Sequence, residues 1–207
     1  SSSSANVKRF VLYDSLGFWL NEKFGLGASV DYSHHDRNYA GSGISDSNLF
    51  ASIILDSNNS QDYFRLRKLN PGAYLKFNLN KLDLNVGGFA DYQYYFNISK
   101  WNYFGYGLSA NARLALQKYK GYHGVKYYLA GYQTSGFEVS SANQFEIDSN
   151  NRLNFNFTVE SLNPDLQYIN YTGNHFSLNN VVNGMPTTAK LNGLYSNKGL
   201  GVDFGVC

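Results

Sequence analysis

The chain of 207 residues has little cysteine, little proline and little charge. Its single cysteine, Cys207, excludes an internal disulfide framework. Charged residues make up 15%, against about 25% in soluble domains, and a net charge of +2 argues against a nucleic-acid partner. No apolar run approaches the ~18 residues that a transmembrane helix needs. Zinc-type Cys/His spacing and glycine-rich phosphate loops are absent, so no metal or cofactor is expected.

Aromatic residues are abundant, with 18 Tyr and 15 Phe, and they suit the pleated surface of a β-strand. The clearest pattern runs from Leu69 to Asn97. Two arms of alternating apolar and polar residues flank the polar pair Asn80-Lys81, which predicts a long β-hairpin. On this hairpin Leu75 and Val86 belong to the apolar face.

Similar alternation recurs at residues 24–33, 106–117, 153–159 and 200–206. We therefore expect an all-β, antiparallel, up-and-down sheet of about ten strands, with about 8 to 12 possible. Residues 1–6 are rich in serine and are expected to be disordered, so that residues 7–207 form one domain. A long polar loop is expected from His34, and residues 34–61 are a candidate surface for a partner.

Alternation alone fits both a soluble barrel with a buried apolar face and a membrane barrel with an apolar face toward lipid. The expected strands are long, and short turns alternate with longer Ser/Asn/Gly loops, which favours a transmembrane β-barrel. Aromatic residues near expected strand ends match an interfacial girdle; they are Trp19, Tyr92, Tyr94, Tyr95, Trp101, Tyr103 and Tyr106. A soluble, calycin-like carrier of an apolar ligand remains an alternative.

Three stretches resemble the small bacterial outer-membrane β-barrel proteins: FGLGASVDYS, AYLKFNLNKLDLNVGGFADYQYYF and GLGVDFGV. The resemblance implies a barrel in the outer membrane of a Gram-negative bacterium, in contact with lipid and lipopolysaccharide. It also implies a structural or cell-surface role, or a narrow porin-like passage for small solutes. Such proteins usually end on an aromatic residue of the apolar face, whereas here Cys207 falls on the polar face and the last aromatic residue is Phe204.

The polar face supplies the candidate lumen residues, which are Asp31, Tyr74, Lys76, Asp83, Asp91, Arg113 and Asp203. They either line an open pore or pair with one another in a plugged lumen, and both hypotheses stay open. Two arginines of the apolar face, Arg65 and Arg67, are candidates for contact with lipopolysaccharide phosphates, because the guanidinium group binds phosphate well. The alternative for both is a solvated charge above the bilayer.

An enzyme is the remaining alternative. The tripeptide at His175 and Ser177 resembles the His-x-Ser element of outer-membrane lipid A deacylases, in which His175 would be the base and Ser177 the nucleophile. The surrounding sequence NHFSLNN departs from that family's pattern, and no acidic residue follows before Asp203. The sequence predicts neither a solute nor an oligomeric state.

Overall fold

The computed structural model describes residues 2–42, 59–164, 168, 170–172, 177–179 and 184–206, and its elements are strands. They are β1 (Ser2–Trp19), β2 (Phe24–Ser42), β3 (Asn59–Leu79), β4 (Leu82–Phe96), β5 (Lys100–Ala115), β6 (Tyr119–Ala130), β7 (Phe137–Glu146), β8 (Asn151–Ser161), β9 (Asn170–Thr172), β10 (Ser177–Asn179), β11 (Thr187–Asn197) and β12 (Val202–Val206). In these residues no helix has the length and apolar character needed to cross a membrane.

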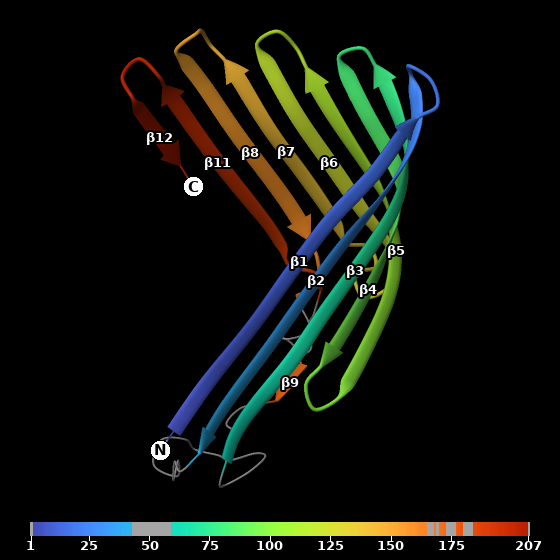
Figure 1. Ribbon diagram of the computed structural model, residues 1–207, viewed down its shortest axis with the longest axis vertical. Coiled ribbons are helices and arrows are strands. Elements are labelled where there is room, and N and C mark those ends of the chain that lie inside the picture. Colours follow the sequence, from blue (N-terminus) through green and yellow to red (C-terminus); the bar gives the residue numbers. More distant parts are fainter. Residues whose placement is uncertain are drawn as a thin grey trace.

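Ten strands form one antiparallel sheet in the order β1-β2-β3-β4-β5-β6-β7-β8-β11-β12. The sheet curls so that β1 to β3 pass in front of the later strands (Figure 1). Among the described residues β1 and β12 are the two edges and do not pair with each other. The expected all-β, up-and-down arrangement is confirmed, as an open sheet; β9 and β10 form a separate two-stranded sheet.

The predicted hairpin is β3–β4, and its turn is Asn80-Lys81 as expected. Asn80 has a positive φ of 63°, which asparagine tolerates better than most residues. Its backbone N–H donates to Oδ1 of Asn78 at 3.0 Å. Such tight turns join strands at one end of the sheet, called here the turn end, at the top of Figure 1. The opposite end is called the loop end.

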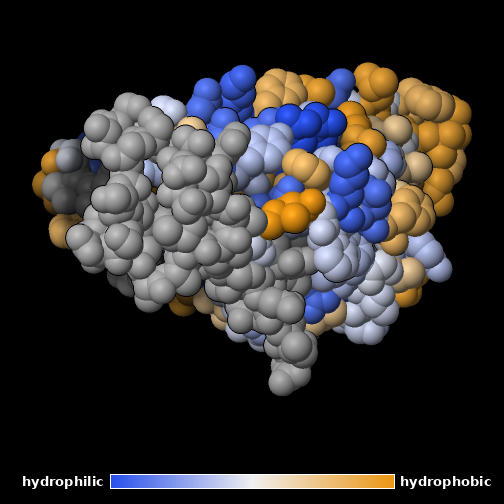
Figure 2. Space-filling model, turned by 90° about the horizontal axis from the view of Figure 1, so that it is seen from below, coloured by the Kyte–Doolittle hydropathy of each residue, from blue (hydrophilic) through white to orange (hydrophobic). Residues whose placement is uncertain are grey.

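The register separates the strand residues into two faces. On β3 and β4 Leu75 pairs with Val86, and the neighbouring pair Lys76 and Asn85 lies on the other face. The convex face is apolar and exposed; Phe104 is 66% exposed and Leu108 is 56% exposed. Its exposed residues include Phe10, Leu12, Leu16, Phe18, Leu69, Leu75, Val86, Tyr92, Tyr106, Val125, Leu153, Phe155 and Leu191. Seen from below, hydrophobic residues gather at the right-hand side of the molecule (Figure 2).

The buried hydrophobic cluster is small and lies at the loop end of the concave face. Phe64, Leu66 and Tyr95 pack there with Tyr171 of β9. Tyr95 is fully buried, and Tyr103 stacks near Tyr132 with ring centroids 4.9 Å apart against this cluster. The interior is therefore aromatic at the loop end.

The structure differs from the sequence-based expectation in two segments. Residues 2–6 are the start of β1 and pair with residues 38–42 of β2, where disorder and a loop were expected. Residues 59–61 also belong to a strand, so only the middle of the expected loop 34–61 falls outside β2 and β3, and residues 43–58 lie outside the described part. Backbone hydrogen bonds form a ladder whatever the side chains are, so the polar composition concealed this extension.

The expected aromatic girdle is only partly correct. Tyr92 and Tyr106 are exposed on the convex face. In contrast Trp19 lines a concave cavity, and Tyr95 and Tyr103 belong to the interior cluster. These residues are near strand ends, as expected, but adjacent strand residues point to opposite faces. Position along a strand therefore does not decide which environment a ring meets.

Candidate functional site

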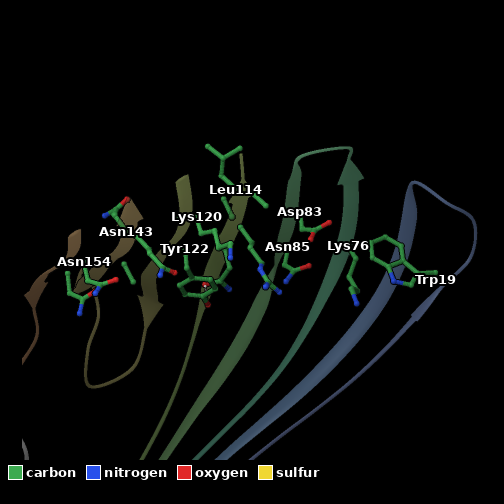
Figure 3. Close-up of a pocket in the computed structure, with 17 residues that line it drawn as sticks. Trp19, Lys76, Asp83, Asn85, Leu114, Lys120, Tyr122, Asn143 and Asn154 are labelled. Carbon is green, nitrogen blue, oxygen red and sulfur yellow. Dashed lines mark hydrogen bonds between the residues drawn. The ribbon is translucent and has the colours of Figure 1, made fainter. Parts of the chain in front are cut away.

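The concave face holds a cavity of about 780 Å³ at the turn end, called here the vestibule. Its lining comes from β1 and from β3 to β8; the residues include Trp19, Lys76, Asp83, Asn85, Asn111, Arg113, Lys120, Tyr122, Gln144, Asn154 and Asn156. Figure 3 shows these polar side chains along the upper ends of the strands. The lining is thus rich in amides and cations.

Local sequence explains how Lys76 reaches into this space. It is the cross-strand partner of Gly25, and Gly17 lies close by on β1. A Cβ at Gly17 would come 3.0 Å from the Lys76 Nζ, so a larger residue there would push the ammonium aside. The ammonium instead sits 4.7 Å from the centre of the Trp19 ring, a favourable cation–π distance.

Positive charge predominates in the vestibule. Lys76, Arg113 and Lys120 face a single carboxylate, Asp83. In the described part of the chain no ion pair within 4.0 Å joins any of these four groups. The cavity is therefore an uncompensated cationic space that attracts anions.

Two other cations, Lys126 on β6 and Arg152 on β8, are paired with carboxylates. Lys126 pairs with Glu138 at 3.6 Å, and Glu138 also accepts a hydrogen bond from the Tyr128 hydroxyl at 2.5 Å. Arg152 pairs with Glu146 at 3.6 Å. These two cations are compensated by neighbouring carboxylates, in contrast to the three cations of the vestibule.

A smaller cavity of about 250 Å³ lies next to the vestibule and shares Asn85, Asn111 and Tyr122 with it. Asp31 and Tyr74 line this second cavity. Both spaces are therefore parts of one polar interior.

A network of buried polar side chains occupies part of the concave face toward the loop end. Asp91 is only 5% exposed and accepts hydrogen bonds from Asn70 Nδ2 at 3.1 Å and Gln93 Nε2 at 2.9 Å. A buried carboxylate requires such donors. Together with the Phe64–Tyr95–Tyr171 cluster, this network fills the loop end of the concave face.

Side-chain amides fasten the segment after β8 over this end. Asn97 accepts from the Thr172 backbone N–H at 2.8 Å and donates to the Tyr63 carbonyl at 2.6 Å. Gln133 exchanges two hydrogen bonds with the Asn163 backbone, at 3.1 and 2.6 Å. These contacts attach Asn163 and Thr172 to the loop end of the sheet.

The structure brings most of the predicted lumen residues to the concave face. Lys76, Asp83 and Arg113 line the vestibule, whereas Asp31 and Tyr74 line the smaller cavity. Asp91 lies in the buried network described above. Asp203 pairs in register with Ser196 on β11, and its side chain is outside the described part.

Trp19, Lys120 and Tyr122 line the vestibule but were not predicted as lining residues. Trp19 was expected at the membrane interface, near a strand end. The register of β5 with β6 could have identified the other two, since Tyr122 is opposite Arg113. Residues opposite one another in an antiparallel pair share a face.

The two arginines of the convex face differ in whether a carboxylate balances their charge. Arg65 forms a two-pronged contact with Asp36, at 2.9 and 3.1 Å. Burial alone would raise the pKa of Asp36, but hydrogen bonds from Arg65 and His34 outweigh it and lower this pKa. Arg67 donates to His34 Nδ1 at 3.2 Å and has no carboxylate partner among the described residues. Arg67 therefore keeps the available positive charge.

Neither a metal site nor the His-x-Ser pair can be built from the described residues. His34 and His35 are adjacent on β2 and point to opposite faces. In the described ranges no three His, Cys, Asp or Glu side chains gather in a way that could hold a metal ion. His175 lies outside the described residues, and so does the side chain of Ser177.

Comparison of the chain with models of protein families, with curated proteins and with solved structures found no match.

Proposed function

We propose that the chain is a transmembrane β-barrel of the bacterial outer membrane, with its convex face against lipid. The observation that carries this proposal is the inverted distribution of polarity. Large apolar side chains such as Phe104 and Leu108 are exposed, while Asp91 and Gln93 are buried. A side chain of this size gains about 1.5–3 kcal/mol when it leaves water. Lipid supplies that burial for a whole face at once.

The same inversion weighs against a soluble carrier of an apolar ligand. A carrier of the calycin type needs an apolar cavity, since the ligand must leave water. Here both interior cavities have amide side chains such as Asn85 and Asn111 in their lining, and the vestibule adds the cations Lys76, Arg113 and Lys120 to its apolar lining residues. The apolar surface is on the wrong side for that role.

Closure of the barrel is part of the proposal. In a meander of ten strands the first and the last run antiparallel, so β1 and β12 have the relative direction that closure requires. Pairing of these edges would also satisfy backbone groups that hydrocarbon cannot solvate.

Within this barrel we assign the interior a closed form rather than an open pore. The Phe64–Tyr95–Tyr171 cluster and the Asp91 network fill the loop end. The vestibule admits small anionic solutes from the turn end, because its three cations face one carboxylate. The role is then structural, with weak anion binding, and not free passage.

Spin labels at two adjacent residues of β5 test the membrane assignment. In a Cys207→Ser background, Leu108→Cys and Ser109→Cys place a nitroxide on the convex and concave faces respectively. In lipid vesicles the label at 108 is expected to be accessible to oxygen and shielded from a nickel chelate, with the reverse at 109. Equal accessibility of both labels to the nickel chelate would refute a lipid-facing convex surface.

Reaction rates of a vestibule thiol test the anion preference. Asn111→Cys, again with Cys207→Ser, should react faster with an anionic than with a cationic methanethiosulfonate. Removing one cation by Lys120→Gln should slow the anionic reagent about fivefold and speed the cationic reagent about fivefold, because two charges at close range in water-like surroundings interact by about 1 kcal/mol. The ratio of the two rates should therefore fall by about 25-fold. Lys190→Gln, on β11 and outside the vestibule lining, is the control. An unchanged ratio would contradict the proposal, and discrete planar-bilayer conductance steps would contradict a closed lumen.

Lipopolysaccharide contact is proposed for Arg67 rather than for Arg65, whose charge Asp36 already balances. Arg67→Gln is expected to weaken binding of purified lipopolysaccharide, and Arg65→Gln is expected to weaken it less. The opposite order would show that the pairing with Asp36 does not govern this contact.

A further inference from the structure

On β6 and β7 four polar side chains interrupt the apolar convex face. Tyr119 and His123 lie on β6, and Ser141 and Asn143 lie on β7. His123 is directly opposite Ser141 in the register. The next outward pair toward the loop end is Val125 with Val139, so the polar group adjoins apolar surface.

These side chains form a closed ring of hydrogen bonds. Ser141 Oγ lies 3.0 Å from His123 Nδ1, and His123 Nε2 lies 3.2 Å from the Tyr119 hydroxyl. The Tyr119 hydroxyl donates to Asn143 Oδ1 at 2.6 Å, and Asn143 Nδ2 donates to Ser141 Oγ at 2.7 Å. Every member thus contacts two others.

The direction of the ring follows from its amide. Asn143 Nδ2 also lies 3.4 Å from the Phe155 carbonyl, which can only accept, so the atom there is the nitrogen. The Tyr119 hydrogen is used on Asn143, and Tyr119 must therefore accept from His123 Nε2–H. His123 Nδ1 is then the free base, and the Ser141 hydroxyl donates to it.

A glycine makes this arrangement possible. Gly121 lies between Tyr119 and His123 on β6. A Cβ at Gly121 would come 2.3 Å from the Tyr119 hydroxyl oxygen and 2.8 Å from His123 Nε2. Any side chain there would separate the two groups, so the ring depends on its absence.

An apolar groove of about 410 Å³ begins beside the serine and the histidine. Its lining includes His123, Ser141, Leu84, Ala110, Val125 and Val139. The small side chains of Ala110 and Ala112 hollow the surface between larger neighbours. The groove presents hydrocarbon on nearly all sides, which suits an acyl chain.

We propose that Ser141 and His123 form a nucleophile–base pair that hydrolyses carboxylic esters whose acyl chain occupies this groove. A serine hydroxyl is a weak nucleophile until an adjacent base accepts its proton. His123 Nδ1 is within reach of that proton, and Tyr119 fixes the imidazole by accepting from its other nitrogen.

The reaction balances without any group beyond water. Ser141 Oγ bonds to the carbonyl carbon as its proton passes to His123 Nδ1. The ester C–O bond then breaks, and the leaving alkoxide takes that proton and departs as the alcohol. Water then attacks the acyl carbonyl carbon as His123 Nδ1 takes one of its protons. The bond from that carbon to Ser141 Oγ breaks, the carboxylic acid leaves, and His123 returns the proton to Ser141 Oγ. Asn143 Nδ2, which contacts Ser141 Oγ in the resting state, is the donor nearest the developing oxyanion.

The test uses the full chain folded in detergent micelles, with p-nitrophenyl palmitate and acetate as substrates. Ser141→Ala is expected to lower kcat for the palmitate ester by about 100-fold or more. Ser109→Ala, on β5 and in the lining of the smaller concave cavity rather than of the groove, is the control and should keep full activity. A fluorophosphonate probe should label Ser141 in the Ser109→Ala protein, as located by mass spectrometry.

Two further variants separate catalysis from a structural role. Ala112→Leu narrows the groove, so it should lower kcat/KM for palmitate and leave acetate hydrolysis unchanged. Tyr119→Phe should lower kcat with little change in KM, because Tyr119 orients His123 and does not touch the substrate. Circular dichroism shows whether each variant is folded. Folded wild-type protein without ester turnover or labelling, or Ser141→Ala with full activity, would overturn the proposal.

Discussion

Two buried tyrosines on the concave face should respond to loss of the hydroxyl group in opposite directions. Tyr95 is completely buried, and its hydroxyl has no hydrogen-bond partner in the described part of the chain. Tyr128 is 6% exposed, and its hydroxyl donates to Glu138 at 2.5 Å. The two side chains share chemistry and burial and differ in whether the polar atom is satisfied.

The magnitudes follow from that difference. A buried polar group without a partner costs about 1–3 kcal/mol, so Tyr95→Phe should raise the free energy of unfolding by about 1 kcal/mol after some loss of packing. Tyr128→Phe removes a hydrogen bond to a charged group and should lower the free energy by about 1.5–3 kcal/mol. Tyr95→Ala removes the ring itself and should cost about 3–5 kcal/mol.

Urea unfolding in lipid vesicles measures these changes. Trp101 is the cross-strand partner of Tyr95, so its fluorescence reports on this end of the sheet. Linear extrapolation gives the free energy for each variant, provided that the slope with urea is unchanged. A Tyr95→Phe protein destabilised by more than about 1 kcal/mol would refute an unsatisfied hydroxyl.

Three further perturbations test other parts of the molecule. Gly27→Ala brings a Cβ to 2.3 Å from the Tyr74 ring and should lower the free energy of unfolding by about 1–3 kcal/mol. Gly193→Ala is the control, because a Cβ there has nothing within 4 Å and should leave the stability unchanged. Equal urea midpoints for the two variants would contradict this packing. The lowered pKa of Asp36 means that its ionised form stabilises the folded state above its unfolded pKa of about 3.9, and that this stability is lost as the pH falls through the lower folded pKa. Asp36→Asn should therefore be less stable than wild type at pH 6 and converge with it in acid, in urea titrations at each pH; a constant difference would refute this linkage. Asn97→Ala removes the contacts to Thr172 and Tyr63 and should speed protease cleavage between residues 162 and 186, as judged on gels, while Asn150→Ala at the turn end should not.

The hairpin at residues 69–97 shows what the sequence alone could predict. Alternation identified both arms, the turn at Asn80-Lys81 and the face to which Lys76 and Asp83 belong. Each of these depends only on neighbours along one chain segment. Local periodicity and turn chemistry are sufficient for such features.

The partners of side chains from separate strands were not predictable in the same way. The pairing of Asp36 with Arg65 depends on the register of β2 with β3 across residues that the sequence presented as a loop. The ring around Ser141 likewise depends on the register of β6 with β7. One signal was present: His123, Ser141 and Asn143 are polar residues at positions where the alternation calls for apolar ones. A one-residue shift of register would have moved all three to the other face.

The sheet leaves β8 at Ser161 and resumes in β11 at Thr187, and these two residues are direct cross-strand partners. Residues 162–186 are thus an excursion whose two ends meet. The excursion can be lengthened, exchanged or replaced by a tight turn without altering the register of a single strand. Changes in residues 162–186, by evolution or by design, could therefore alter the loop end while the order and register of the ten strands stay the same.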